Sequence, residues 1–334
     1  MQIIRIYTGP TAAPCARKGE RERMRCPVRR LLAAFFAAVA VCAGGSGCSA
    51  RQAQEEPSFR VVSSFYPIYI MALNVTDGVE GVQVENMAGQ QAGCLHDYQL
   101  QTKDMRALEQ ADVFLINGAG MESFLTEAAE RIPDLTIVDS GEGVPLIESA
   151  TGEAHDHGGE EHSHEDCNPH IWVSVSNCIL QVKNIARGLQ EADPAHAAQY
   201  EENAERYVEK LEDLRARMHE AIDPLPHKKI VTFHEAFPYF AEEFGLEIVR
   251  VVNREPDSQP SARELAETIR LVEDAGVTAV FAEPQYPESA ANIIAEESGI
   301  RVWLLDPVVT GPDDKDAYLD AMEQNLQVLE EALS

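Results

Sequence analysis

Asp193–Pro224 reads DPAHAAQYEENAERYVEKLEDLRARMHEAIDP, and this segment sets the architecture expected for the whole chain. Its apolar residues recur at steps of four and three, the spacing of one face of a continuous helix. They are Tyr200, Ala204, Tyr207, Leu211, Leu214 and Met218. Asp193 and Pro194 supply a capping carboxylate and a proline where a helix can begin, and Asp223-Pro224 ends it. At about 1.5 Å per residue the helix would be on the order of 40 Å long. We interpret residues 193–223 as a rigid spine joining two halves; an ordinary surface helix within one domain is the alternative.

On both sides of this spine, short β-rich runs alternate with helical ones. The predicted strands are Arg60–Ser64, Val82–Met87, Val113–Asn117, Leu135–Asp139, Ile230–Phe233, Leu246–Val252, Val277–Ala282 and Ile300–Leu305. The predicted helices are Pro67–Asp77, one capped by Thr102, Met121–Arg131, Val175–Glu191, Glu235–Phe244, one from Ser261 to Gly276, one ending at Gly299, and Asp316–Leu333. This alternation predicts an α/β fold of two lobes, each with a mostly parallel central sheet flanked by helices. One long rigid helix bridges them, between an N-terminal lobe over 58–192 and a C-terminal lobe over 224–334.

The first 47 residues have the character of an export signal rather than of a folded domain. Arginines precede the apolar run Leu31–Ala43, which is too short to span a bilayer, and small residues lead from it to Cys48. A cysteine in this position resembles the lipobox of bacterial lipoproteins, in which the thiol is lipidated. We expect translation to start at Met24, residues 1–47 to be removed, and residues 48–57 to form a lipidated tether.

The charge of the chain excludes one class of partner. The formal net charge is −29, and the first 47 residues hold 8 of the 27 Lys and Arg residues but 2 of the 56 Asp and Glu residues. From Cys48 onward the balance is therefore 19 − 54 = −35. Phosphate binding needs a basic face, so nucleic acid is not an expected partner, whereas a cation is.

Glu153–Trp172, EAHDHGGEEHSHEDCNPHIW, holds five of the ten histidines. Imidazoles and carboxylates are ligands for zinc, and two glycines keep the segment pliable, so we interpret the acidic loop 153–167 as an accessory metal collector. Its histidines are His155, His157, His162 and His164. A solvated acidic loop is the alternative. The segment ends at His170, which Pro169 and Trp172 are expected to hold rigidly.

Five side chains are candidates for one metal site. In parallel α/β sheets, ligands bind at the carboxyl ends of the strands, and His234, Glu283 and Asp306 each follow a predicted strand of the second half. His96 and His170 are the candidates in the first half. Three imidazoles and one carboxylate form a natural tetrahedral zinc set. The carboxylate is either Asp306 or Glu283.

Cys94 and Cys167 lie two residues before His96 and three before His170, respectively. If those two histidines meet at one metal, the thiols could also meet beside it. We therefore predict a disulfide between Cys94 and Cys167, which an exported location permits.

Five segments resemble the motifs of the zinc and manganese substrate-binding lipoproteins of bacterial ABC importers. They are Gly93–Tyr98 (GCLHDY), Asn117–Leu125 (NGAGMESFL), Asn168–Trp172 (NPHIW), Phe233–Phe237 (FHEAF) and Leu305–Pro307 (LDP). The resemblance implies two α/β lobes with the metal at their interface, held by His96, His170, His234 and Asp306, with Glu283 in reserve for the fourth place. In that family a histidine at the third position accompanies zinc and a glutamate accompanies manganese, so His234 indicates zinc.

We therefore expect a monomeric, lipid-anchored receptor at the bacterial cell surface or in the periplasm. It captures Zn²⁺ and delivers it to an ABC permease and its ATPase, without catalysis. One alternative is manganese or iron as the cargo. Another is a zinc hydrolase with Glu235 as the base, although Pro238 rules out a His-Glu-x-x-His helix at this point.

Overall fold

The computed structural model describes residues 58–89, 95, 98–122, 125, 129, 131–149, 167–252, 261–285 and 289–334. The chain from Glu55 to Ser334 forms one compact unit. Within the described ranges, no helix combines the length and apolar character needed to cross a membrane. The predicted export signal, Cys48 and the tether lie outside these ranges.

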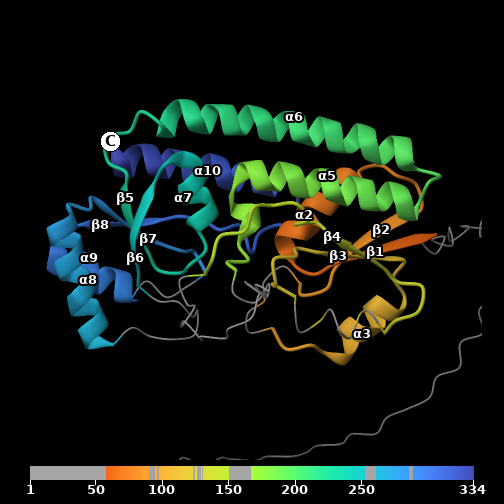
Figure 1. Cartoon of the computed structure of the whole chain (residues 1–334), viewed down its shortest axis with the longest axis horizontal. Coiled ribbons are helices and arrows are strands. Elements are labelled where there is room, and N and C mark those ends of the chain that lie inside the picture. The colour runs from red at the N-terminus through yellow and green to blue at the C-terminus, as the bar shows by residue number, and fades with distance from the viewer. Residues whose placement is uncertain are drawn as a thin grey trace, which may run out of the picture. The chain divides into compact units, whose positions relative to one another are not determined.

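The first sheet contains four parallel strands in the order β2-β1-β3-β4 (Figure 1). The strands are β1 (Phe59–Ser63), β2 (Val82–Asn86), β3 (Val113–Ile116) and β4 (Thr136–Asp139), and the helices of this half are α2 (Tyr66–Val75), α3 (Thr102–Glu109), 3-10 helix η3 (Ile171–Val173) and α5 (Val175–Ala192). Side chains alternate across the central strands. Val61 and Leu115 join the core that contains α2 and α5, whereas Val62 and Phe114 pack with Leu108 of α3.

The second sheet repeats this plan as β6-β5-β7-β8, again all parallel. Its strands are β5 (Lys229–Thr232), β6 (Glu247–Val251), β7 (Ala279–Ala282) and β8 (Arg301–Leu304), with helices α7 (Pro238–Phe244), α8 (Ala262–Ala275) and α9 (Ser289–Ser298). Every residue of central strands β3 and β7 is buried, as expected for strands covered on both faces. The predicted α/β class, with two parallel sheets flanked by helices, is confirmed.

The predicted spine is helix α6 (Ala197–Ile222), of 26 residues. All six residues of its predicted apolar stripe are buried. The helix begins later than expected, because Asp193 ends α5 instead of capping α6. The Asp193 carboxylate accepts a hydrogen bond from the Tyr200 hydroxyl at 2.9 Å and lies 2.6 Å from His196 Nδ1, so it braces the turn between the two helices.

One hydrophobic core runs through both halves of the compact unit. Leu115 of β3, Leu211 of α6 and Phe281 of β7 belong to the same buried cluster, together with Leu329 of α10 (Ala317–Leu333). Helices α5 and α10 lie alongside α6 (Figure 1). The two sheets are therefore joined by shared apolar packing as well as by the chain connection.

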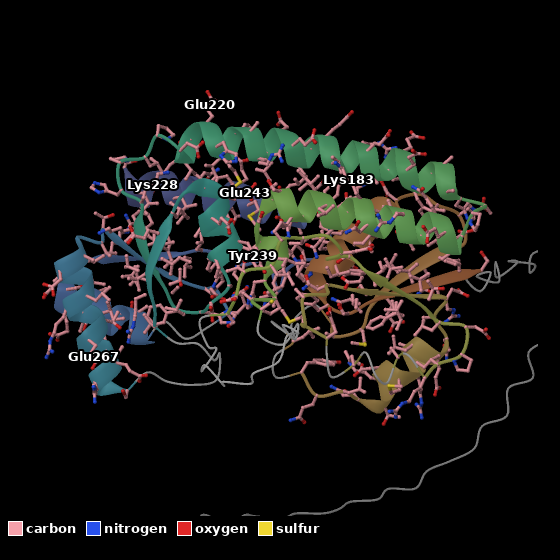
Figure 2. All side chains as sticks on the ribbon, in the orientation of Figure 1. Lys183, Glu220, Lys228, Tyr239, Glu243 and Glu267 are labelled. Atoms are coloured by element: carbon pink, nitrogen blue, oxygen red, sulfur yellow. The ribbon has the colours of Figure 1, made fainter. Side chains whose placement is uncertain are left out.

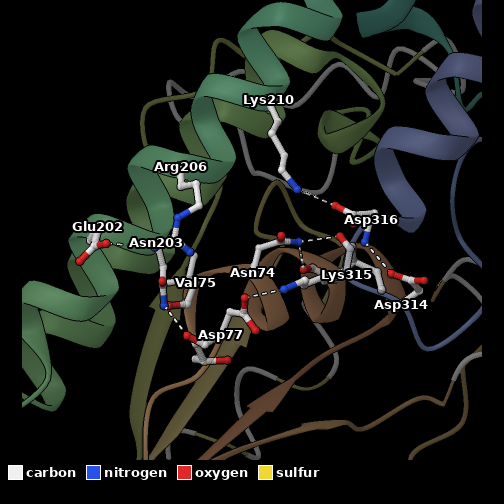
Figure 3. A network of polar contacts seen from close by, with 12 residues as sticks. Asn74, Val75, Asp77, Glu202, Asn203, Arg206, Lys210, Asp314, Lys315 and Asp316 are labelled. Atoms are coloured by element: carbon white, nitrogen blue, oxygen red, sulfur yellow. Dashed lines mark hydrogen bonds and ion pairs between the residues drawn. The ribbon is translucent and has the colours of Figure 1, made fainter.

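The segment between β8 and α10 returns to the first half. The Tyr66 hydroxyl donates to Pro312 O at 2.8 Å, and the Tyr69 hydroxyl donates to Asp313 Oδ1 at 2.7 Å. Figure 3 shows the adjoining network, in which Asn74 Nδ2 donates to Lys315 O at 2.7 Å. These contacts fasten residues 312–315 to α2.

Two further predicted helix starts are wrong. Thr102 is the first helical residue rather than the cap; Gln101 precedes the helix and donates its backbone N–H to Asp104 at 2.7 Å. The helix expected from Glu235 starts at Pro238, because a proline disfavours helical conformation in the residue before it and fits the first turn.

Candidate metal site

Three of the predicted ligands follow adjacent strands of the second sheet. His234 follows β5, Glu283 follows β7 and Asp306 follows β8, and in the sheet β5 neighbours β7, which neighbours β8. Because these strands are parallel, their carboxyl ends share one edge. The Phe233 N–H donates to Phe281 O at 3.2 Å and extends the pairing of β5 to the residue before His234.

His170 and His234 meet, although they come from different halves of the chain. Their ring centroids are 4.7 Å apart, with the ring planes at 84°. The two residues are 2% and 3% exposed, respectively. Two imidazoles that are buried edge to face, each carrying a nitrogen lone pair when neutral, form a natural pair of ligands for a divalent cation.

Glu283 is a buried carboxylate beside this pair. It is 1% exposed, and its Oε1 lies 3.4 Å from Nδ1 of His234. Neither oxygen accepts a well-formed hydrogen bond from the residues that the structure describes. Burial raises the pKa of Glu283, His234 lowers it, and nearby Asp306 raises it. A buried carboxylate with so few donors is costly unless positive charge compensates it, so this site fits a cation.

Asp306 is held by a network that sequence reasoning missed. Its Oδ1 accepts hydrogen bonds from the Val308 N–H at 2.8 Å and from Gln285 Nε2 at 3.2 Å. Its backbone N–H and carbonyl bond the side-chain amide of Asn325 on α10, each at 2.8 Å. Burial raises the pKa of Asp306. The signal in the sequence was Asn325, a polar residue on the apolar face of a helix.

Trp172 links the segment that carries His170 to the segment that carries Asp306. Its ring centroid lies 5.2 Å from that of His170, and its indole N–H donates to Pro307 O at 2.7 Å. The Tyr318 hydroxyl of α10 donates to Trp172 O at 2.9 Å. The contact with His170 agrees with the predicted role of Trp172 as a support for that histidine.

A second buried carboxylate, Glu122, supports the loop that packs beside His170. It accepts hydrogen bonds from Ser64 Oγ at 2.7 Å, Asn117 N at 2.8 Å and Gly118 N at 3.2 Å. Burial raises the pKa of Glu122 to about 7, against the lowering effect of these donors. Asn117 Nδ2 in turn donates to Pro169 O at 2.9 Å. Glu122 belongs to the Asn117–Leu125 motif, but this supporting role was not predicted from the sequence.

The remaining predicted site residues lie outside the described ranges. They are His96, Cys94, His155, His157, His162 and His164. The disulfide between Cys94 and Cys167 therefore stays a prediction. The two flanks of the predicted collector can be placed: Glu148 and Cys167 form an antiparallel bridge, and the Ser149 hydroxyl donates to Glu235 at 3.3 Å. The described residue Ser149, on one flank of that loop, thus contacts the residue after His234.

Within the described part of the chain, no three His, Cys, Asp or Glu side chains are arranged so that they could hold one metal ion together. A metal site at the pair of His170 and His234 would need a further ligand from outside the described ranges. His96, the predicted ligand from the first half, lies there.

The paired parallel sheets define an α/β protein with two sheets, and comparison with known sequences identifies its family. The ZnuA family profile, described as zinc-uptake complex component A, periplasmic, matches residues 61–332. The chain belongs to this family.

Individual relatives agree with this assignment. The zinc-binding lipoprotein AdcA of Streptococcus pneumoniae (strain ATCC BAA-255 / R6) is 31% identical over 293 residues, which cover 85% of this chain and 57% of AdcA. The crystal structure of Zn(II)-bound AdcA from Streptococcus pneumoniae matches with a TM-score of 0.70 and 25% identity, over 82% of this chain and 57% of that one. The chain therefore spans a little over half the length of AdcA.

A further solved structure is matched along nearly its whole length. FpvC from Pseudomonas aeruginosa, a solute-binding protein in complex with Mn²⁺, gives a TM-score of 0.71 and 28% identity. The match covers 82% of this chain and 98% of that one.

Proposed function

We propose that this protein is the metal-capturing component of a zinc uptake system and binds Zn²⁺ between its two sheets. The observation that carries the proposal is the buried contact of His170 with His234, at 4.7 Å between ring centroids. These histidines precede and follow α6 in sequence, so a cation bound by both would bridge the two halves. Membership of the ZnuA family and the likeness to the zinc-binding lipoprotein AdcA support zinc as the ion.

The proposed ligands are His96, His170, His234 and Asp306. Because no three described side chains are grouped to hold one ion, this set requires Asp306 to approach the two histidines when zinc binds. The resemblance of Leu305–Pro307 to the family motif makes Asp306 the proposed fourth ligand. Its Oδ1 accepts two hydrogen bonds, which orient the carboxylate. Glu283, the reserve candidate, faces Nδ1 of His234. A carboxylate in that position orients a metal-bound histidine whose other ring nitrogen holds the metal, so we assign Glu283 this supporting part.

The surroundings of the site follow from the same proposal. The chain is acidic, which attracts a cation and disfavours nucleic acid. The collector histidines His155, His157, His162 and His164 would raise the local zinc concentration. Lipidation at Cys48 would anchor a monomeric receptor outside the cytoplasm, where it passes zinc to an ABC permease and its ATPase.

The proposed role is binding without catalysis. Members of this family are solute-binding components of transporters. Glu235, the base required by a hydrolase, accepts a hydrogen bond from Ser149 at 3.3 Å. Pro238 occupies the start of α7, where a second histidine of a catalytic helix motif would need continuous helix from His234.

Manganese is the second candidate cargo. It is favoured by the likeness to the Mn²⁺ complex of FpvC and by two carboxylates, the buried Glu283 beside His234 and the half-buried Asp306 near Glu283. Carboxylate oxygens suit manganese, whereas an imidazole-rich set suits zinc. With His96, His170 and His234 as ligands, zinc is the stronger candidate.

Titration calorimetry on the chelator-stripped protein tests the proposal. We expect one tight zinc equivalent in the wild type, its loss in His170→Ala and His234→Ala, and weaker binding of manganese. His219→Ala is a matched control, because His219 lies on α6 beside Asp223. Retention of the tight zinc equivalent in both site variants would refute the proposed location, and preferential binding of manganese would refute the proposed cargo.

A further inference from the structure

Asn168 is a buried side chain at the centre of the contacts between the two histidine segments. Its Oδ1 accepts the backbone N–H of His170 at 3.0 Å and lies 3.1 Å from His170 Nδ1. Its Nδ2 donates to the backbone carbonyl of Glu235, the residue after His234, at 2.8 Å. One amide therefore touches the segments of both histidines.

The orientation of this amide is fixed by chemistry. If its oxygen and nitrogen were exchanged, the nitrogen would face the His170 N–H as donor against donor. The oxygen would then face the Glu235 carbonyl as acceptor against acceptor, in a buried place where unsatisfied polar groups are costly. Both contacts favour the same orientation, with the oxygen toward His170.

An amide oxygen can only accept hydrogen bonds, so the His170 Nδ1 at 3.1 Å must carry the proton. The lone pair of the neutral ring then resides on Nε2. We propose that Asn168 is a positioning residue that fixes this tautomer of His170, so that Nε2 is its metal-binding atom, and couples the ring to the His234 segment. The inference rests on the proposed function, because it takes His170 as a ligand.

Tyr239 strengthens this coupling from the first turn of α7 (Figure 2). Its hydroxyl donates to Asn168 O at 2.7 Å and accepts the Ile147 N–H at 3.0 Å. The Asn168 N–H donates to Ile147 O at 2.8 Å, which closes the arrangement. With both its amide and its backbone engaged, Asn168 has little freedom to turn away from His170. The two imidazoles are therefore held in place before a cation arrives, which lowers the cost of ordering them on binding.

The test measures both the tautomer of His170 and the affinity of the protein for zinc. In metal-free protein at a pH where imidazoles are neutral, ¹⁵N NMR of ring-labelled histidine reports which nitrogen is protonated, and His170→Ala assigns the signal. We expect an Nδ1-protonated ring in the wild type. In Asn168→Leu we expect loss of that single tautomer and a zinc affinity about 10- to 100-fold weaker, measured by chelator competition.

Asn203→Leu is the matched control. Asn203 is also buried, and its Nδ2 donates to the backbone carbonyls of Val75 and Asp77 at 3.0 and 2.9 Å, so the variant loses a comparable structural amide. We expect it to lose stability while keeping the His170 tautomer and the zinc affinity. The proposal is overturned if Asn168→Leu keeps both, or if Asn203→Leu weakens zinc binding equally. Absence of zinc binding by the wild type would count against the proposed function instead, since the tautomer is measured without metal.

Discussion

At the scale of single residues, buried polar groups rather than apolar ones set the geometry of the site. Asn168, Gln285 and Asn325 each hold a predicted ligand or its backbone through hydrogen bonds of 3.2 Å or less. Gln285 and Asn325 lie 21 and 19 positions from Asp306, and Asn168 also bonds Glu235, 67 positions away. Spacing along the chain therefore predicts His170, His234 and Asp306 as strand-end or loop residues but gives no information on the side chains that support them.

Glu122 is another buried polar side chain, and its effect on stability can be measured through the pH dependence of unfolding. Burial raises its pKa in the folded protein to about 7, from an ordinary value of 4.5. Between these values the folded state binds more protons than the unfolded state, so stability falls as pH rises through this window. We predict that the contribution of Glu122 to the free energy of unfolding falls by up to about 3 kcal/mol as the pH rises from 4.5 to 7.

The measurement is urea denaturation of metal-free protein at pH 5 and at pH 8, in the wild type and in Glu122→Gln. The change in unfolding free energy from pH 5 to pH 8 should be more positive in the variant than in the wild type, because glutamine does not titrate. Equal differences in the two proteins would show that Glu122 does not titrate in this window. The comparison across pH cancels any constant cost of replacing a carboxylate that accepts the N–H groups of Asn117 and Gly118.

At the scale of elements, periodicity predicted which segments form helices, while capping boxes and a proline set where some of them start. The apolar stripe of α6 was correct at all six positions, because only a helix buries residues at steps of three and four. Its first turn was misplaced because Asp193 hydrogen-bonds Tyr200 from outside the helix. The capping box from Ser261 to Glu264 was correctly predicted, since both partners are close in sequence.

The return of residues 312–315 to α2 is a feature that no local pattern indicates. A Cβ atom on Gly311 would lie 2.3 Å from the Tyr66 hydroxyl oxygen, which donates to Pro312 O. We predict that Gly311→Ala destabilises the fold by about 1–3 kcal/mol through overpacking. Tyr66→Phe removes that oxygen, so the double variant should cost less than the sum of the single variants, as measured by chemical denaturation. Strictly additive costs would show that this contact does not couple the two segments.

At the scale of the whole molecule, the two sheets have the same strand order, β2-β1-β3-β4 and β6-β5-β7-β8, without an evident sequence repeat. The alternation of strands and helices was enough to predict two parallel sheets, because parallel strands need helical crossovers. It did not predict that Leu115 and Phe281, one from each sheet, belong to a single core. This shared core packs together the two halves of the chain that carry His170 and His234.

The most direct measurement is zinc K-edge X-ray absorption fine structure on protein that lacks residues 154–166 and is loaded with one equivalent of zinc. The deletion removes the four collector histidines. Glu148 and Cys167, which flank the deleted segment, are already partners in an antiparallel bridge, so a short connection can join them. A site of His96, His170, His234 and Asp306 predicts three imidazole nitrogens and one oxygen at about 2.0–2.2 Å. A sulfur neighbour at about 2.3 Å, or fewer than three imidazoles, would contradict a zinc site held between the two sheets by these residues.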